Sequence, residues 1–336
     1  KERFMSEVLV LGGCAWGTAL ANLLADNTKK SVYLWSYEKE VANTINTKLI
    51  NKKYLPSKKI NKKIIASSSL PKFYISVVFV VIPSQYIFDF FKKFEKYFIN
   101  NKKNVYNFII CSKGIDLKRK KLLSDIVKKF FPKSNIAILS GPSFAIDVLN
   151  EKPTAVTLAT KSPKLASISL NLLSNRYFRV YLSKDIIGVQ INGAMKNILA
   201  IAAGLTEGLS LGENARAAIL ARGIKEIIRL TVAFGGKKET VFGLSGIGDI
   251  ILTCVSKSSR NYKLGYMLGE GQDLKDILQK SNHVAEGLEN IKVVYYLKKK
   301  YKVNMPILTA IYNVLVKKYS FDKVIQQLLS RPIKDE

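Results

Sequence analysis

The stretch VLVLGGCAWGTALANLLA, residues 8–25, predicts how the first part of this chain folds. An apolar segment of strand length, 8–12, runs through a glycine-rich turn into a helical pattern that begins near Gly17. In such a strand–turn–helix unit, free N–H groups and the dipole at the helix start bind the pyrophosphate of a dinucleotide. A plain glycine-rich turn is the simpler alternative. The strand before the turn and the helix after it favour dinucleotide binding.

Each residue of the turn has its own task in this interpretation. Gly12 makes the tight turn after the strand, and Gly17 lets the helix pack closely against that strand. The middle position, where a glycine admits the phosphate, is occupied by Cys14, which departs from the usual pattern. The residues of the turn that we expect to contact the cofactor are Gly12, Cys14, Ala15, Trp16 and Gly17.

The acid that binds the adenosine ribose is expected about 20 residues further along, at the end of the second strand. Ser36 stands at the end of the second predicted strand, SVYLW at 31–35, and Glu38 follows two residues later. Glu38 fits the 2′-hydroxyl of NAD, whereas Ser36 with Lys39 nearby tolerates the 2′-phosphate of NADP. The sequence leaves the choice between NAD and NADP open.

The first half of the chain alternates strand-like and helical segments, whereas the second half is helical. Amphipathic segments separate the short β-rich runs, which fall at 75–82, 106–111, 136–140 and 154–160. This alternation predicts a doubly wound α/β sheet of the Rossmann type. From about Asp185 onward, long helical patterns are broken by glycines. We therefore expect an α/β protein: a Rossmann-like NAD(P)-binding domain at residues 1–185, then an all-helical substrate and catalytic domain at 186–336.

The composition argues against several kinds of protein. The 336 residues include three dispersed cysteines and one histidine, His283, which argues against a disulfide framework, a zinc site and a multi-histidine metal site. The formal net charge is +29, yet only nine of the 54 basic residues are arginine and the lysines are scattered, which argues against nucleic-acid binding. The two most apolar stretches, 73–91 and 186–205, contain too many polar residues for membrane insertion. We expect a soluble, cytoplasmic protein.

Lys196 is the only charged residue between Ile186 and Leu205, in a stretch that is otherwise apolar or small. A lysine set in an apolar helix loses solvent, which disfavours its ammonium form and favours proton exchange near neutral pH. The alternative is a lysine whose long side chain reaches the surface from a half-buried helix. The dinucleotide-binding pattern upstream favours the catalytic interpretation.

Several short segments follow one another in an informative order between about residue 8 and about residue 315. They are GGCAWGTALA at 12–21, Tyr54-Leu55-Pro56, Pro83-Ser84, Ser112-Lys113-Gly114, SGPSFA at 140–145, GAMKN at 193–197, Gly212-Glu213-Asn214, GIGD at 246–249, Thr253-Cys254, Ser259-Arg260-Asn261, Ala285-Glu286-Gly287 and Met305-Pro306-Ile307. With these segments the chain resembles the bacterial NAD(P)-dependent glycerol-3-phosphate dehydrogenase family. Cys14 is the clear departure from the family pattern.

The resemblance implies hydride transfer from a reduced nicotinamide to the C2 carbonyl of dihydroxyacetone phosphate. The product is sn-glycerol 3-phosphate, which supplies glycerophospholipid synthesis. The resemblance also implies that the cofactor is NAD or NADP and that the protein forms a homodimer. Lys196 matches the catalytic lysine, which gives a proton to the alkoxide as it forms. Lys113 orients the substrate and polarises its carbonyl, and Asp249 contacts the substrate and holds the lysine ammonium.

The other motif residues match contacts to substrate and cofactor. The resemblance implies a substrate site made of Lys113, Gly141, Ser143, Lys196, Asn197, Asp249, Ser259, Arg260 and Asn261. Beyond the glycine-rich turn, the implied cofactor contacts are Ser36, Lys113, Ala145, Arg260, Val284 and Glu286. Arg260 suits a phosphate because a guanidinium binds it bidentately.

Each of these assignments has a simpler alternative. Lys113 could be one more solvated lysine, Asp249 a helix N-cap, Arg260 a surface arginine and Glu286 a solvated loop acid. At the level of the whole chain, a related reductase of another small keto acid would use Arg260 for a carboxylate. A non-catalytic dinucleotide sensor would fit Cys14, although the presence of Lys113, Lys196 and Asp249 argues against it.

Overall fold

The computed structural model of the protein describes residues 8–72, 75–100, 107–280 and 286–332. The chain divides into two compact units. The first comprises residues 1–113 and 122–186, and the second comprises 114–121 and 187–336. Residues 114–121 therefore belong with the helical part of the chain, although they lie in the α/β half of the sequence.

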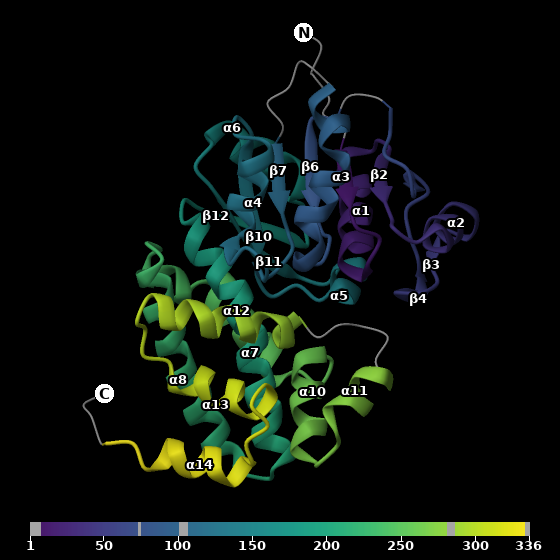
Figure 1. The fold of residues 1–336 in the computed structure, drawn as a ribbon. Coiled ribbons are helices and arrows are strands. Elements are labelled where there is room, and N and C mark those ends of the chain that lie inside the picture. The colour runs from purple at the N-terminus through teal and green to yellow at the C-terminus, as the bar shows by residue number, and fades with distance from the viewer. Residues whose placement is uncertain (1–7, 73–74, 101–106, 281–285, 333–336) are drawn as a thin grey trace. The chain divides into compact units, whose positions relative to one another are not determined.

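The first unit is built on an eight-stranded sheet (Figure 1). In spatial order its strands are β12 (Phe178–Ser183), β11 (Thr154–Thr160), β10 (Asn135–Ser140), β7 (Asn107–Ile110), β6 (Val77–Val80), β1 (Val8–Leu11), β2 (Val32–Trp35) and β5 (Ile64–Ser67). Neighbouring strands run parallel, with one exception at β10 and β11. Two small two-stranded sheets pair β3 (Ile50–Asn51) with β4 (Leu55–Lys59) and β8 (Ile115–Asp116) with β9 (Lys121–Leu122).

Helices cover both faces of the large sheet. They are α1 (Ala15–Thr28), α2 (Lys39–Lys48), η1 (Ser84–Tyr86), α3 (Ile87–Asn100), α4 (Leu123–Phe130), α5 (Ala145–Leu149) and α6 (Pro163–Leu173). Helix α1 packs with α5 and α6, whereas α3 packs with α4. Val8 and Val10 of β1 belong to the core shared with α1, while Leu9 is equally buried and alternates to the other face. The predicted fold class, a doubly wound α/β sheet followed by helices, is confirmed.

The antiparallel pairing of β10 and β11 departs from the expected parallel pattern. Helix α5, which connects them, has only five residues and spans about 7.5 Å. The six residues of β10 extend over about 20 Å. The connection contains no longer helix that packs across the sheet, and β11 enters at the end where β10 leaves, so the two strands run in opposite directions.

Two strands of the large sheet, β5 and β12, were not predicted from the sequence. Both stand at edges, where one side of the strand lacks a neighbour. The residues of β5 alternate between buried and exposed positions, whereas in β12 only Phe178 is buried and Tyr181 and Leu182 are about half exposed. An edge strand therefore lacks the continuous apolar run that marks the central strands.

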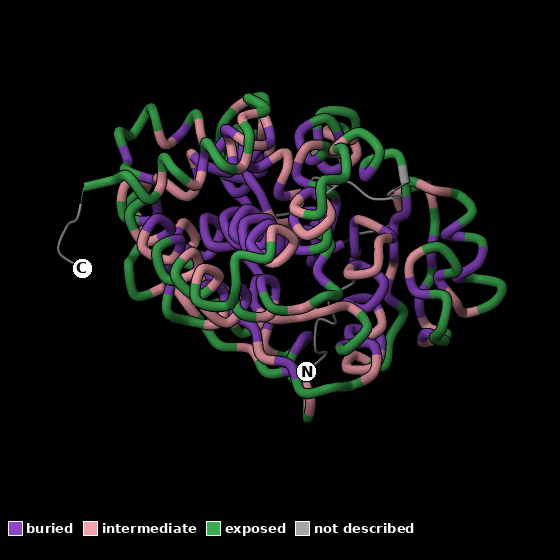
Figure 2. Tube along the Cα trace, turned by 90° about the horizontal axis from the view of Figure 1, so that it is seen from below, coloured by how far each residue is buried: buried purple, intermediate pink, exposed green. Residues whose placement is uncertain are grey.

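The second unit is helical. Its elements are α7 (Ile186–Gly208), α8 (Gly212–Ala233), η2 (Lys238–Phe242), η3 (Leu244–Gly248), α9 (Asp249–Val255), α10 (Arg260–Gly269), α11 (Leu274–Lys280), α12 (Glu286–Lys300), α13 (Pro306–Leu315) and α14 (Phe321–Leu329). Helix α7 is long and apolar enough to cross a membrane, but 89% of its most apolar window is buried inside the protein. Buried residues form long uninterrupted purple stretches in Figure 2, as expected for strands and a helix enclosed by other elements. Burial thus accounts for the apolar sequence of α7.

Glycines let α7 and α10 approach each other at backbone distance. A β-carbon on Gly204 of α7 would lie 2.0 Å from the carbonyl oxygen of Tyr262, and one on Gly265 of α10 would lie 2.1 Å from that of Ile201. No other residue fits at either position without moving a helix. This contact holds the start of α10 against α7, the helix that carries Lys196.

Candidate functional site

The turn after β1 forms a cradle of the shape that the sequence predicts. Gly12 has a φ of +129°, and a β-carbon there would lie 2.8 Å from the carbonyl oxygen of Val81. A β-carbon on Gly17 would lie 1.9 Å from the carbonyl oxygen of Gly12, so the helix can approach the turn this closely only because residue 17 is glycine. No acidic residue lies in the first turn of α1, which leaves its positive end suited to a pyrophosphate.

Cys14 is the N-cap of α1, and Ala15, Trp16 and Gly17 form the first turn of the helix. The φ of Cys14 is −73°, which any residue adopts, and its Sγ accepts a hydrogen bond from the N–H of Gly17 at 3.5 Å. The backbone at this position therefore does not require glycine. The cysteine therefore occupies the capping position at the start of α1.

The end of β2 places Ser36 and Glu38 in different surroundings. Ser36 is buried, and a β-carbon on Gly13 would lie 2.6 Å from its Oγ, so Ser36 lies against the glycine-rich turn. Glu38 is the N-cap residue of α2 and is only partly buried. Its carboxylate accepts hydrogen bonds from Lys53 and from the hydroxyl of Tyr54.

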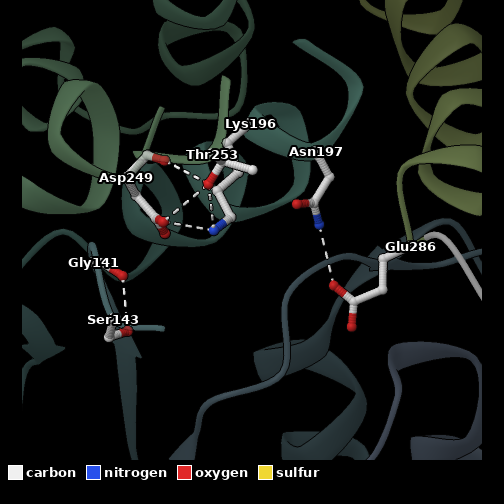
Figure 3. A network of polar contacts seen from close by, with 7 residues as sticks. All are labelled: Gly141, Ser143, Lys196, Asn197, Asp249, Thr253 and Glu286. Atoms are coloured by element: carbon white, nitrogen blue, oxygen red, sulfur yellow. Dashed lines mark hydrogen bonds and ion pairs between the residues drawn. The ribbon is translucent and has the colours of Figure 1, made fainter. Parts of the chain in front are cut away.

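Three further predicted residues of the first unit follow strand ends. Lys113 is partly buried and comes after β7; Ser112 beside it donates to the carbonyl oxygen of Val80 at 3.1 Å. Gly141, with a φ of +147°, follows β10, and the hydroxyl of Ser143 donates to its carbonyl oxygen at 2.9 Å (Figure 3). Ala145 is the first residue of α5.

A buried ion pair lies within the second unit. The Nζ of Lys196 on α7 lies 2.5 Å from Oδ1 of Asp249 on α9 and donates to the hydroxyl oxygen of Thr253 at 3.2 Å (Figure 3). Lys196 is 7% exposed and Asp249 is 1% exposed. Lys196 does not reach the surface, so the snorkelling alternative is wrong. The sequence predicts that desolvation disfavours the ammonium form of Lys196. The Asp249 carboxylate acts in the opposite direction and stabilises the ammonium.

The glycine-rich segment before α9 brings Asp249 into this position. Gly246 lies in the π-helical turn η3, and a β-carbon there would lie 1.9 Å from the carbonyl oxygen of Val241. Gly248 is the N-cap residue of α9, and Asp249 is its first residue. Asp249 is therefore not the N-cap, and its side chain is engaged by Lys196. Burial also raises the pKa of the neighbouring Cys254 thiol to about 12, so this cysteine stays protonated.

Asn197 and Glu286 form a second polar contact in this unit. The amide nitrogen of Asn197 donates to Oε2 of Glu286 at 3.1 Å, at the start of α12 (Figure 3). The next residue, Gly287, donates its N–H to Oδ1 of Asn261 at 3.0 Å. Glu286 is thus not a solvated loop acid, because it is the first residue of a helix and accepts from Asn197. Val284 and His283 lie outside the described residues.

The start of α10 holds the remaining predicted substrate residues. Ser259 is buried and caps the helix, with its Oγ accepting from the N–H of Tyr262 at 3.3 Å. Arg260 is exposed in the first helical position, beside the buried Asn261. An exposed guanidinium and the positive end of a helix therefore lie together, and both attract anions.

Known proteins match this chain over nearly its whole length. Models of the NAD-dependent glycerol-3-phosphate dehydrogenase N-terminus and C-terminus match residues 7–166 and 185–326. The glycerol-3-phosphate dehydrogenase [NAD(P)+] of Bacillus anthracis is 39% identical over 337 residues, which cover 99% of this chain and 98% of that protein. This chain belongs to the NAD-dependent glycerol-3-phosphate dehydrogenase family. The resemblance inferred from the ordered motifs is confirmed.

Solved structures place the chain among glycerol-3-phosphate dehydrogenases along its whole length. The enzyme gpsA of Coxiella burnetii is 35% identical with a TM-score of 0.92, covering 98% of this chain and all of that one. GPD1 of Saccharomyces cerevisiae is 27% identical with a TM-score of 0.82, covering 96% and 99%. D-mandelate dehydrogenase, at 14% identity and a TM-score of 0.61, shares the fold alone.

Thr253 is a residue of this dehydrogenase site to which sequence reasoning assigned no role. Its hydroxyl accepts from Lys196 and donates to the main-chain carbonyl oxygen of Asp249 at 2.6 Å. The signal was present, because Thr253 follows Asp249 by four residues and so lies on the same face of α9. Within the described ranges, no group of three or more His, Cys, Asp or Glu side chains is arranged to hold a metal ion.

Proposed function

We propose that the chain catalyses the NAD(P)H-dependent reduction of dihydroxyacetone phosphate to sn-glycerol 3-phosphate, and the reverse reaction. The observation that carries this proposal is the buried Lys196–Asp249 ion pair in a member of this family. A buried ammonium held beside a carboxylate can give its proton to an oxygen that gains negative charge.

The first part of the chain, residues 1–185, would hold the cofactor. Gly12, Cys14, Ala15, Trp16 and Gly17 would bind the pyrophosphate, and the bound NAD(P)H would supply the hydride. The tight turn at Gly12 and Gly17 supports this role, as does the partial exposure of Cys14, Ala15 and Trp16 at the start of α1. The remaining proposed cofactor contacts are Ser36, Lys113, Ala145, Arg260, Val284 and Glu286.

The second part, residues 186–336, would supply the proton. Lys196 would give it to the carbonyl oxygen of the substrate as that oxygen becomes an alkoxide, and would take it back in the reverse reaction. Asp249 and Thr253 would hold the ammonium in one direction through their hydrogen bonds. Lys113 would polarise the same carbonyl.

The phosphate of the substrate would bind at the start of α10. Arg260 is exposed there and offers two parallel N–H donors, next to Ser259 and Asn261. Gly141, Ser143 and Asn197 would contact the rest of the substrate. In the cell, we propose a cytoplasmic homodimer without membrane insertion that supplies glycerophospholipid synthesis.

Two measurements test this proposal. The first follows oxidation of NADH and of NADPH by absorbance, with dihydroxyacetone phosphate as substrate and unphosphorylated dihydroxyacetone as control. Turnover only with the phosphorylated compound is the expected result. Absence of turnover with either cofactor, in protein that binds dinucleotide, would reject it.

The second measurement addresses the phosphate. Arg260→Ala should raise KM for dihydroxyacetone phosphate by about tenfold or more, because a charge-assisted pair is lost. Lys263→Ala, an exposed cation on the same helix, is the matched control and should change KM little. An unchanged KM in Arg260→Ala would remove this arginine from the phosphate site.

A further inference from the structure

The structure assigns this chain a preference for NAD over NADP. Glu38 sets this preference, and hydrogen bonds from Lys53 and Tyr54 hold its carboxylate in place. The inference rests on the proposed dinucleotide site and decides what the sequence leaves open. In a dinucleotide-binding sheet, the adenosine ribose lies beyond the end of the second strand, where an acidic residue binds its 2′-hydroxyl. Glu38 is the acidic residue at that place, three positions after the last residue of β2.

The Glu38 carboxylate is held from two sides. Lys53 donates to Oε1, and the hydroxyl of Tyr54 donates to Oε2 at 3.0 Å. Hydrogen bonding to Glu38 raises the pKa of Lys53, and burial together with Glu38 raises the pKa of Tyr54, so both stay protonated donors. A carboxylate has about four lone-pair sites, so two remain for the hydroxyls of a ribose. The acceptor is therefore held in position before a cofactor arrives.

The same arrangement disfavours the 2′-phosphate of NADP. That phosphate carries a charge of about −1.5 to −2 and would lie next to the Glu38 carboxylate. Glu40 adds a second negative charge in the first turn of α2. Lys53 is already paired with Glu38, so its positive charge does little to offset the repulsion between the phosphate and the two carboxylates.

A bidentate partner for a 2′-phosphate is also missing from this part of the sequence. No arginine occurs between Arg3 and Arg119, and the guanidinium is the side chain best suited to grip a phosphate. Ser36, which could have tolerated the phosphate, is buried against Gly13. Lys39 remains as an exposed cation beside two carboxylates on the same short segment.

The test measures dinucleotide affinity in the absence of substrate, by calorimetric titration of the full chain with NADH and with NADPH. NADH should bind more tightly than NADPH by about tenfold or more, the ratio that one lost hydrogen bond to a charged group produces. Equal affinities, or tighter binding of NADPH, would overturn the inference whatever the variants show.

Variants then test whether Glu38 causes the preference. Glu38→Ala should weaken NADH binding and leave NADPH binding equal or tighter, so the ratio should fall by about tenfold. Tyr54→Phe should shift the ratio in the same direction by a smaller factor, because it removes one of the bonds that hold Glu38. Glu40→Ala removes an exposed acid in the same turn that has no place in the proposed ribose site, so it should leave NADH affinity unchanged and shift the ratio by much less than Glu38→Ala. An unchanged ratio in Glu38→Ala would contradict the assignment.

The outcome is separable from that of the proposed reaction. A chain that prefers NADH but does not reduce dihydroxyacetone phosphate would retain this inference and lose the proposed function. A chain that reduces the substrate and binds NADPH more tightly than NADH would retain the proposed function and lose this inference.

Discussion

Two buried carboxylates of the helical unit, Asp249 and Glu226, have similar burial and different partners. They are 1% and 2% exposed. Asp249 faces the ammonium of Lys196, a side chain that can gain and lose a proton. Glu226 on α8 instead accepts from the backbone N–H groups of Ile307 at 2.5 Å and Leu308 at 3.0 Å, at the start of α13. Glu226 therefore caps a helix, whereas Asp249 holds a group that can take part in chemistry.

The comparison also shows that a shifted pKa does not by itself mark an active site. Burial raises the pKa of Glu226 to about 7, although its two backbone N–H partners and the cations Arg229 and Lys298 act in the opposite direction. Catalytic acids are often tuned to this range. Glu226 nevertheless serves helix α13, so the partner, and not the pKa, distinguishes a catalytic carboxylate from a structural one.

The largest expected effect comes from removing the ammonium. Lys196→Met should lower kcat by about 10²–10⁴-fold, the usual contribution of a general acid, while NADH binding measured by titration persists. Retention of more than about a tenth of the activity would reject Lys196 as the proton donor.

The control for folding is the double variant Lys196→Met/Asp249→Leu. Leaving Asp249 buried without its cation should cost about 3–5 kcal/mol of unfolding free energy, whereas replacing both charges is often neutral. Urea unfolding should therefore show stability recovered in the double variant, with activity still absent. Recovery of activity would mean that the loss was structural.

The pH dependence of stability should separate Glu226 from other carboxylates. Its pKa is about 7 in the folded chain against an ordinary value of 4.5, so between these values the folded state binds more protons at this site. This proton uptake adds to the free energy of unfolding below pH 4.5. The added stability, about 3 kcal/mol in all, is lost as the pH rises through 7. The free energy of unfolding, measured by urea titration, should therefore rise in Glu226→Gln relative to the wild type as the pH is raised from 5 to 8. A difference that does not change with pH would contradict this.

A matched pair of amide substitutions tests the comparison directly. Asp249→Asn should lower kcat by about tenfold to a hundredfold, because a hydrogen bond to a charged group contributes about 1.5–3 kcal/mol. Glu226→Gln makes the same chemical change at a site with similar burial and should leave kcat within about twofold. Equal losses of kcat in both variants would mean that the assay reports stability and not chemistry.

The smallest expected effect is at Thr253. Thr253→Val keeps the shape of the side chain and removes the hydroxyl that accepts from Lys196. Loss of one such bond at about 1 kcal/mol should lower kcat/KM about fivefold. Thr206→Val is the control. Thr206 is also buried in a helix, and its hydroxyl donates to the carbonyl oxygen of Ala202 within α7. It should alter kcat/KM little.

The sequence by itself determined the cradle, the central strands and the isolation of Lys196. Each of these rests on neighbours in the chain: glycines at close spacing, continuous apolar runs in strands covered on both faces, and one charge in an apolar helix. The ordered motifs likewise identified the family because each motif is a short run of neighbouring residues. Local pattern carries this information without knowledge of what packs against it.

Only the tertiary structure decided which groups face one another. Lys196 meets Asp249 across 53 residues, Glu226 reaches Ile307 across 81, and Tyr54 reaches Glu38 across 16. The edge strands β5 and β12 and the reversed β11 likewise depend on neighbours elsewhere in the sheet. The charge state and the task of a buried group follow from its partners, and partners this distant in sequence are brought together only by packing.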